Sequence, residues 1–438
     1  MTWSRIKHGL LIFLIALSLF LSFQIWTAGG QYRQPTSTGS TTVTTSLAER
    51  TMAEVFSADR IIWHRNAIGR TVESNTFHMT EWLSNAIETM EFGEVETPER
   101  LTREEYEDSI SFGNWVEFLF DAPIPFGLFS ESFDNLPTDY ENRTFTRFYI
   151  NTDDPLQLGF YDSINEIQYN VDDSNFTQDI MYDLLYSPDN EFREVERFEL
   201  GDRAIYLPTD EVEVEYRDYL VERLPNNLYI NHFFEDRSEV DGRRTGNTTR
   251  YIDLTTEVRV NDATNTLTYL RQRTDLGQMT FSDRLLSSYR ELQMVENWTE
   301  TIQYHAYYPE TQQVVFQRHI QGYPVFSYQQ LESTVAITVV ESGLTNLSLP
   351  IRVVQTPITL TGSTMKTLPS GSDIIEMVRQ TELGLDPIQD IRVGLTWMES
   401  EEDERVVHYE PHWYIQTQDV WYEMNRYMEL QEAIPNGF

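Results

Sequence analysis

The sequence predicts an α+β fold with antiparallel sheets flanked by helices, preceded by one N-terminal transmembrane helix. Three observations lead to this prediction. Short apolar runs bounded by Gly, Pro, Asn and Asp recur along the 438-residue chain, as they do where strands alternate with turns. Fewer segments repeat their apolar residues at helical spacing after a capping residue. A long apolar segment without charges precedes all of them.

Residues 9–27 form this apolar segment, which is interrupted only by Ser18, Ser22 and Gln24. A helix of this length spans about 28 Å, close to the hydrocarbon thickness of a bilayer. Ser18 and Ser22 share one helix face, and Gln24 can hydrogen-bond near the outer boundary. This side of the helix is therefore a candidate contact with a second transmembrane helix. Serines that are merely tolerated in an apolar helix would give the same pattern.

The basic flank of the segment lies on its N-terminal side only. Because Arg5 and Lys7 precede it, the positive-inside rule places residues 1–8 in the cytoplasm and the later domains outside. We therefore expect a single-pass protein of the cytoplasmic membrane. The alternative is a signal peptide that is cleaved between Thr27 and Gly29. An uncleaved anchor is favoured because the apolar run exceeds the usual length of about 7 to 15 residues in a signal peptide.

The composition excludes several classes of function. With 70 acidic and 32 basic residues, the formal net charge is −38, so a nucleic acid partner is not expected. The absence of cysteine excludes thiol nucleophiles, thiolate metal sites and disulfides. Lys366 is the one lysine beyond the first ten residues, which leaves a single candidate for lysine chemistry. A hydrophobic fraction of 40% is enough for packed cores.

Changes in composition and in the order of elements divide the chain. The predicted parts are a cytoplasmic tail (1–8), the transmembrane helix (9–27), a flexible linker (28–50), an N-terminal extracytoplasmic domain (51–206), a middle α+β domain (207–303) and a C-terminal α+β domain (304–438).

The N-terminal domain is predicted to contain two helices among its strands. One helix covers residues 80–90, where apolar residues recur at helical spacing, and the other follows Ser174 as its cap. The predicted strands are 61–63, 115–120, 145–150 and 159–169.

The middle and C-terminal domains are predicted to repeat a helix followed by strands. The first of three predicted helices begins at Asp210, where Glu213 completes a capping box, and ends before Pro225. The second begins at about residue 282. The third begins at Ser372 and has Gly384 as its stop. The predicted strands are 228–234, 250–255, 257–260, 267–270, 304–316, 322–326, 391–397 and 406–416, the last two joined by an acidic turn at 399–404.

The order of several local patterns resembles the YycH family (WalH), which comprises membrane-anchored regulators of the WalK/WalR two-component system of Gram-positive bacteria. Each pattern alone is hydrophobic spacing with turn residues, but together they extend over nearly the whole chain. The segments that carry the resemblance are the anchor 7–26, then 55–64, 116–120 with 122–126, 224–234 with its Leu-Pro-Asn-Asn-Leu-Tyr run, 251–269, 322–326, and 370–394 with 411–413.

The resemblance implies one transmembrane helix, a multi-domain extracytoplasmic part and association with the sensor kinase WalK and with the related protein YycI. It also implies that the later domains have a YycI-like fold and that the protein is not an enzyme and needs no cofactor. The strong acidity and the near absence of lysine depart from the family's usual composition, so the electrostatic contacts of relatives cannot be assumed here.

His408, Glu410 and His412 form the sharpest metal candidate. Residues two apart on a strand face the same side and could bind one ion. Ordinary strand residues are the favoured interpretation, because Pro411 restricts the backbone and the neighbouring sequence offers no third strong ligand. We therefore expect no metal site.

The sequence gives no more support to a hydrolytic site than to a metal site. His305 and His319 could serve a serine hydrolase, but no nucleophile motif accompanies them, and Ser370 and Ser372 beside Gly371 fit a turn and a helix cap better. The acidic pairs at 153–154 and 172–173, and the run at 399–404, are interpreted as solvated charge, although the run could attract divalent cations.

The sequence as a whole predicts a non-catalytic regulator that contacts a WalK-type histidine kinase through its transmembrane helix and outer domains, together with a YycI-like partner. We expect its gene to adjoin those of a kinase, a response regulator and a second single-helix protein. The alternative is a hydrolase or ligand-binding protein of the cell envelope. The negative charge disfavours that alternative, since wall polymers are anionic.

Overall fold

The computed structural model describes residues 50–66, 70–74, 90–111, 113–186, 191–201, 203–236, 238, 240–273, 277–327, 329, 331–358 and 364–432. Outside them lie the predicted tail (1–8), the predicted transmembrane helix (9–27) with Ser18, Ser22 and Gln24, the linker up to residue 49, and all but the last residue of the helix predicted at 80–90. Within the described ranges, every helix is too short or too polar to cross a bilayer.

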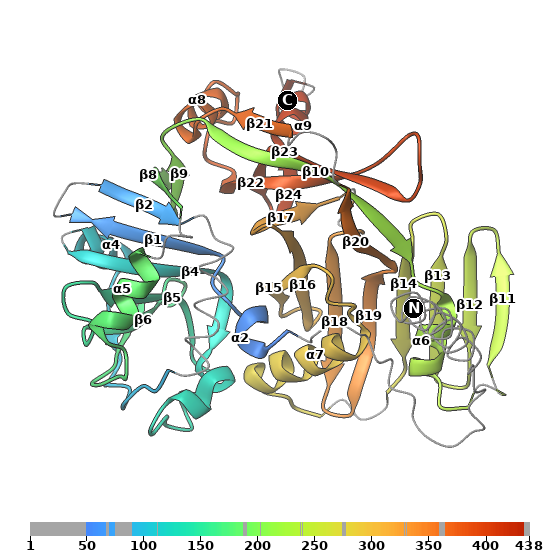
Figure 1. The fold of residues 1–438 in the computed structure, drawn as a ribbon. Coiled ribbons are helices and arrows are strands. Elements are labelled where there is room, and N and C mark those ends of the chain that lie inside the picture. Colours follow the sequence, from blue (N-terminus) through green and yellow to red (C-terminus); the bar gives the residue numbers. More distant parts are fainter. Residues whose placement is uncertain are drawn as a thin grey trace, which may run out of the picture. The chain divides into compact units, whose positions relative to one another are not determined.

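The first part of the described chain builds a nine-stranded antiparallel sheet (Figure 1). The strand order is β3-β7-β6-β5-β4-β1-β2-β8-β9. These strands are β1 (Arg60–Arg65), β2 (Arg70–Ser74), β3 (Glu99–Arg100), β4 (Asn114–Pro125), β5 (Thr144–Asn151), β6 (Leu158–Asp162), β7 (Ile167–Asn170), β8 (Phe192–Leu200) and β9 (Arg203–Pro208). The helices are α2 (Met52–Val55), α4 (Arg103–Ser111), the 3₁₀ helix η2 (Phe126–Ser132) and α5 (Gln178–Tyr186).

Aromatic side chains fill the core of this sheet. Phe118, Phe148 and Phe160 follow one another across β4, β5 and β6, and their ring centroids are 5.4 Å and 4.9 Å apart. Phe126 of η2 covers them, with its centroid 5.2 Å from that of Phe160. The predicted strands 61–63, 115–120 and 145–150 are confirmed, and the predicted strand 159–169 proves to be two strands, β6 and β7.

The second sheet contains fifteen of the described strands. Twelve of them follow the order β11-β12-β13-β14-β19-β18-β16-β17-β22-β23-β10-β20, while β15 pairs with β16, β21 with β10, and β24 with β23. The strands are β10 (Val212–Arg223), β11 (Asp241–Thr245), β12 (Thr248–Ile252), β13 (Thr256–Asn261), β14 (Thr266–Arg271), β15 (Thr301–Tyr308), β16 (Gln313–Ile320), β17 (Tyr323–Phe326), β18 (Thr334–Val340), β19 (Gly343–Pro350), β20 (Arg352–Ile358), β21 (Thr364–Leu368), β22 (Ile388–Glu399), β23 (Val406–Thr417) and β24 (Val420–Glu423).

Four described helices accompany this second sheet: α6 (Asn226–Phe233), α7 (Phe281–Val295), α8 (Gly371–Arg379) and α9 (Met424–Glu432). The helix predicted from residue 282 is confirmed as α7, which Thr280 caps by accepting a hydrogen bond from the backbone of Asp283. α7 packs against β18 of the second sheet and against η2, the 3₁₀ helix that follows β4 of the first sheet (Figure 1).

Two predicted elements are wrong, and they are neighbours. Residues 212–223 form the strand β10 instead of a helix, because alternating Val212 and Val214 are buried and pair with β21. Residues 226–233 form the helix α6 instead of a strand. Tyr229 and Phe233, four residues apart, are buried on its inner side, and Phe233 packs on Tyr269 with ring centroids 4.5 Å apart. The predicted repeat of helix and sheet therefore loses its first helix.

The cap of α8 differs from the prediction by two residues. Ser370, not Ser372, is the N-cap, because only Ser370 has an acidic residue, Asp373, three positions later to complete a capping box. The helix ends at Arg379, ahead of the predicted stop at Gly384. The strands 391–397 and 406–416 are confirmed as β22 and β23, joined by the acidic turn.

The two sheets form one packed body. A single hydrophobic cluster extends from Val55 of α2 through both sheets to Ile351, between β19 and β20. The first sheet ends at β9 and the second begins at β10, and both of the segments 207–303 and 304–438 contribute strands to the second sheet. The domain boundaries given above remain predictions.

Candidate functional site

An ionic cluster lies where the two sheets meet. Arg392 belongs to β22 of the second sheet, and Asp121 belongs to β4 of the first. The guanidinium of Arg392 donates from Nη1 to Asp121 Oδ2 at 2.6 Å and from Nη2 to Asp121 Oδ1 at 2.8 Å. Each of the two side chains is only 14% exposed. This bidentate pair therefore joins the sheets in a largely desolvated setting.

Further groups hold both partners of this pair in place. Arg392 Nε donates to Asp390 Oδ2 at 3.0 Å, and the guanidinium lies 4.7 Å from the ring centroid of Trp421. On the other side, Asp59 Oδ2 accepts a hydrogen bond from the backbone N–H of Asp121 at 2.6 Å. His305 Nδ1 lies 3.4 Å from Asp121 Oδ2. The cluster thus draws residues from five separate parts of the chain.

The charges in the cluster shift pKa values in opposite directions. Burial by itself would raise the pKa of Asp121, but Arg392 and His305 outweigh it and hold that pKa below its ordinary value. Burial, with the negative charge of Asp121, raises the pKa of Asp59 well above its ordinary value. The cluster therefore keeps Asp121 ionised and favours a proton on Asp59.

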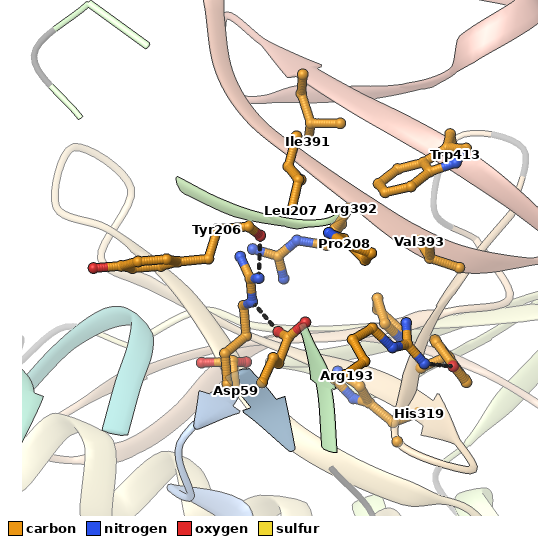
Figure 2. Close-up of a pocket in the computed structure, with 15 residues that line it drawn as sticks. Asp59, Arg193, Tyr206, Leu207, Pro208, His319, Ile391, Arg392, Val393 and Trp413 are labelled. Atoms are coloured by element: carbon orange, nitrogen blue, oxygen red, sulfur yellow. Dashed lines mark hydrogen bonds and ion pairs between the residues drawn. The ribbon is translucent and has the colours of Figure 1, made fainter. Parts of the chain in front are cut away.

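A cavity of about 80 Å³ adjoins the cluster (Figure 2). Leu207 and Pro208 of β9 face Ile391 and Trp413 of the second sheet across it. This volume has room for several water molecules, whereas sites for small-molecule ligands usually measure about 300–1,000 Å³. The arrangement suits a hydrated junction between two sheets better than a substrate pocket.

Two more polar contacts accompany the cavity. Arg60 of β1 donates to Glu73 of β2 at 2.5 Å and also to the carbonyl of Tyr206 in β9. Arg193 of β8 donates to the hydroxyl of Tyr323 in β17 at 3.3 Å, which is a second polar link between the sheets (Figure 2).

A second ionic cluster is buried inside the second sheet. Arg318 is 1% exposed and donates from Nη2 to both carboxylate oxygens of Glu296, at 3.0 Å and 3.1 Å. Arg318 Nη1 lies 3.2 Å from Glu300 Oε2, and the Tyr409 hydroxyl donates to Glu300 Oε1 at 3.0 Å. Burial raises the pKa of the nearby Glu332 to about 7, although Arg352 and Arg318 oppose this shift.

The first sheet has a buried cluster of its own around Glu117. His64 Nε2 lies 2.9 Å from Glu117 Oε2, and the Tyr106 hydroxyl donates to Glu117 Oε1 at 2.8 Å. Burial alone would raise the pKa of Glu117, but His64, Arg147 and Tyr106 lower it below its ordinary value. Each of these partners satisfies a buried carboxylate oxygen, so the cluster has the character of core structure.

The residues of the metal candidate lie on one face of β23, as predicted, but each has a different partner. His408 Nδ1 lies 2.6 Å from Asp218 Oδ1, Lys366 donates to Glu410 at 2.8 Å, and His412 Nδ1 lies 2.7 Å from the hydroxyl of Thr396. Across the described ranges, no group of three His, Asp or Glu side chains has the geometry to hold a metal ion.

The two histidines of the hydrolase alternative have contacts other than the two serines. His305 belongs to the ionic cluster described above, and burial lowers the pKa of His319, which lines the cavity, to about 4. Ser370 is occupied as the N-cap of α8. The acidic pairs make hydrogen bonds to other strands and loops, with Asp153 accepting from Asn114 and Asp172 from the backbone of Glu94. In the acidic run, Asp403 pairs with Arg405 at 2.8 Å.

Sequence reasoning missed the residues of the junction. Asp121 and Arg392 are 271 positions apart, so no local spacing relates them. The available signal was an arginine between Ile391 and Val393 in a predicted strand, where a charged residue needs a buried partner.

Comparison with known proteins decides the family. Residues 4–171 match the family model of the YycH protein N-terminal domain, and residues 202–432 match that of the YycH protein C-terminal domain. The chain belongs to the YycH family. The resemblance deduced from the sequence is thereby confirmed.

A solved YycH structure shares the fold, and a second solved structure is a weaker match. The crystal structure of YycH from Bacillus subtilis has a TM-score of 0.69 and 15% sequence identity, and covers 86% of this chain and 98% of that chain. An uncharacterized protein from Eubacterium rectale has a TM-score of 0.33 and 10% identity over 52% of this chain and 85% of that chain. No curated protein sequence matches. Membership in the YycH family supports a regulatory role in the WalK/WalR system, in a family that is not enzymatic.

Proposed function

We propose that this YycH-family chain is a non-catalytic regulator of a WalK-type sensor histidine kinase and acts together with a YycI-like partner. The observation that carries the proposal is the match of both YycH family models, over residues 4–171 and 202–432. In this proposal the protein is a single-pass protein of the cytoplasmic membrane of a Gram-positive bacterium, with its folded domains outside.

The proposed anchor determines how a signal can pass. In this proposal the influence on the kinase passes through residues 9–27 or through the outer domains. Tethering confines both proteins to one layer and raises their effective concentration, so modest contacts can act together. The protein can shift the kinase between two conformations only by as much as its own affinities for those conformations differ.

The junction between the sheets supports a mechanism by contact. A regulator that favours one kinase conformation needs a surface of fixed shape. The bidentate pair of Arg392 and Asp121 and the packing of α7 on both β18 and η2 hold the two sheets in one arrangement. A contact made by either sheet is therefore transmitted to the other.

The experiment compares two faces of the proposed transmembrane helix. Full-length chain and kinase are co-expressed, and co-purification and kinase autophosphorylation are measured in detergent. The double variant Ser18→Phe/Ser22→Phe adds bulk to the contact face, and Ala16→Phe adds bulk to the opposite side of a helix. We expect the double variant to lose co-purification at least tenfold and the control to retain it. A kinase that neither binds the chain nor changes its autophosphorylation would overturn the proposal.

A further inference from the structure

One segment of this acidic chain is net positive. Residues 241–273, which contain β11 to β14, carry six arginines and four acidic residues, a net charge of +2, while the whole chain carries −38. Because the rest of the chain is strongly negative, this accumulation of positive charge is a local property of four consecutive strands. It is distinct from the proposed kinase contact.

Three of these arginines stand in register across neighbouring strands. Arg243 of β11 is opposite Arg250 of β12, and Arg250 is opposite Arg259 of β13. Directly opposed residues of an antiparallel pair point to the same face of the sheet. Their side chains are 80%, 50% and 53% exposed, in that order. The same line continues through Thr268 of β14 and Ser348 of β19.

The opposite face of these strands is packed. Val258, Val260, Leu267 and Tyr269 are buried there, and α6 packs against β13 (Figure 1). The face that carries the three arginines is therefore the solvent face of the meander. We call it the arginine face and define it by Arg243, Arg250, Arg259, Thr268 and Ser348.

The row of arginines works against stability. Like charges that are directly opposed on adjacent strands repel one another. Glu257 accepts hydrogen bonds from both Arg250 and Arg259, and Asp241 pairs with Arg243, so three arginines share two carboxylates. Protection of an exposed sheet edge would explain a charge on β11, but Arg259 lies two strands further in.

We propose that the arginine face binds a linear polyanion that carries phosphate groups and lies across the strands. Neighbouring strands are about 4.8 Å apart, so the row presents three guanidinium groups over about 10 Å. Guanidinium groups form paired hydrogen bonds with phosphate oxygens, and the hydroxyls of Thr268 and Ser348 extend the line of donors.

Other occupants fit the arginine face less well. A strand added to the edge of β11 would run along that strand and would meet only Arg243 of the row. Protein interfaces are usually centred on buried apolar or aromatic anchors, and on the described part of this face Leu270 is the one exposed large apolar side chain. A phosphate polymer needs no such anchor.

The test uses full-length chain in neutral detergent and linear inorganic polyphosphate of defined length as the probe. The variant Arg243→Gln/Arg250→Gln/Arg259→Gln removes the row. The control Arg100→Gln/Arg405→Gln/Arg426→Gln removes the same charge from paired arginines that are 80%, 78% and 63% exposed elsewhere. We expect the row variant to weaken binding at least tenfold and to lower the logarithmic salt slope by about 2, at about 0.7 per phosphate contact. The control should stay within twofold of the parent chain.

Two further measurements test whether charge or misfolding explains a loss of polyphosphate binding. The variant Arg243→Lys/Arg250→Lys/Arg259→Lys keeps the charge and should keep most of the affinity, and circular dichroism should confirm that every variant is folded. Equal weakening in the row variant and the control would overturn the proposal. Binding a poly-glutamate peptide more tightly than polyphosphate would also overturn it, as would binding single phosphate ions as tightly as polyphosphate. A row variant that binds polyphosphate normally but self-associates would overturn it too, since that result would assign the row to edge protection.

Discussion

The guanidinium of Arg392 donates two parallel hydrogen bonds to the carboxylate of Asp121, and this ion pair links strands of two different sheets. The partners come from β22 and β4 and are each 14% exposed. Removal of one partner of such a pair leaves the other charge in a poorly solvated place, which costs more than the pair itself contributes.

Asp121→Asn should lower the free energy of unfolding by about 2–4 kcal/mol, because Arg392 then loses its bidentate partner. The measurement is urea denaturation of the full-length chain in detergent, followed by tryptophan fluorescence. The matched control is Asp403→Asn, whose partner Arg405 is 78% exposed, and which should cost about 0.5 kcal/mol or less. Equal losses in the two variants would contradict the proposed importance of the junction.

The same pair of variants tests the transmission between the sheets. Asp121→Asn should still co-purify with the kinase, since the proposed helix contact is unchanged, but it should alter kinase autophosphorylation less than the parent chain does. Asp403→Asn should act like the parent. An unchanged effect of Asp121→Asn would show that regulation does not depend on the junction.

The contribution of Glu332 to stability should fall as the pH rises from about 4.5 to about 7. Burial raises its folded-state pKa to about 7, so over this range the unfolded chain releases a proton that the folded chain keeps. The loss is roughly 2–3 kcal/mol from this group, at about 1.4 kcal/mol per pKa unit. Glu332→Gln should lose this falling component when unfolding is measured against pH, whereas Glu401→Gln in the exposed turn should follow the parent chain. Parallel profiles for all three proteins would argue against the role of Glu332.

The cap of α8 gives a sharp local test. Ser370→Ala should cost about 1 kcal/mol, because it removes the acceptor for the backbone N–H of Asp373. Ser372→Ala lies inside the helix and should cost little or slightly stabilise, since alanine is the better helix former. Thermal unfolding distinguishes the two variants. A larger loss of stability in Ser372→Ala than in Ser370→Ala would show that Ser372 is the cap after all.

Strands β1, β4 and β5 of the first sheet were predictable because apolar residues, such as Ile61 to Trp63 and Phe145 to Ile150, leave a local pattern, whereas β2, β3, β8 and β9 were not predicted. β10 was not, because Asp210 and Glu213 imitate a capping box, while the pairing that makes Val212 and Val214 a strand comes from β21, more than a hundred residues later. α6 was misread because its apolar residues also suit a strand, and only packing on Tyr269 decides between them.

The candidate site was less predictable than the fold for the same reason. The three residues of the metal candidate were correctly placed on one strand face, since a strand's two-residue period is local. Their partners Asp218, Lys366 and Thr396 come from other strands and could not be read from spacing. The contact of Arg392 with Asp121 is likewise formed only by the folded chain. The proposed transmembrane contact through Ser18, Ser22 and Gln24 stays a prediction.

The pairing of β10 has a consequence for the order of events during synthesis. Its neighbours β20, β21 and β23 contribute residues between Arg352 and Tyr409, so within the described ranges residues 212–223 pair only with strands that are synthesised more than a hundred residues later. The first sheet can assemble early, since its strands all lie between Arg60 and Pro208, whereas the end of the second sheet that contains β10 must wait for the last quarter of the chain. Late closure of distant contacts slows folding, and an unfinished β10 offers two bare edges to chaperones or to aggregation in the interval.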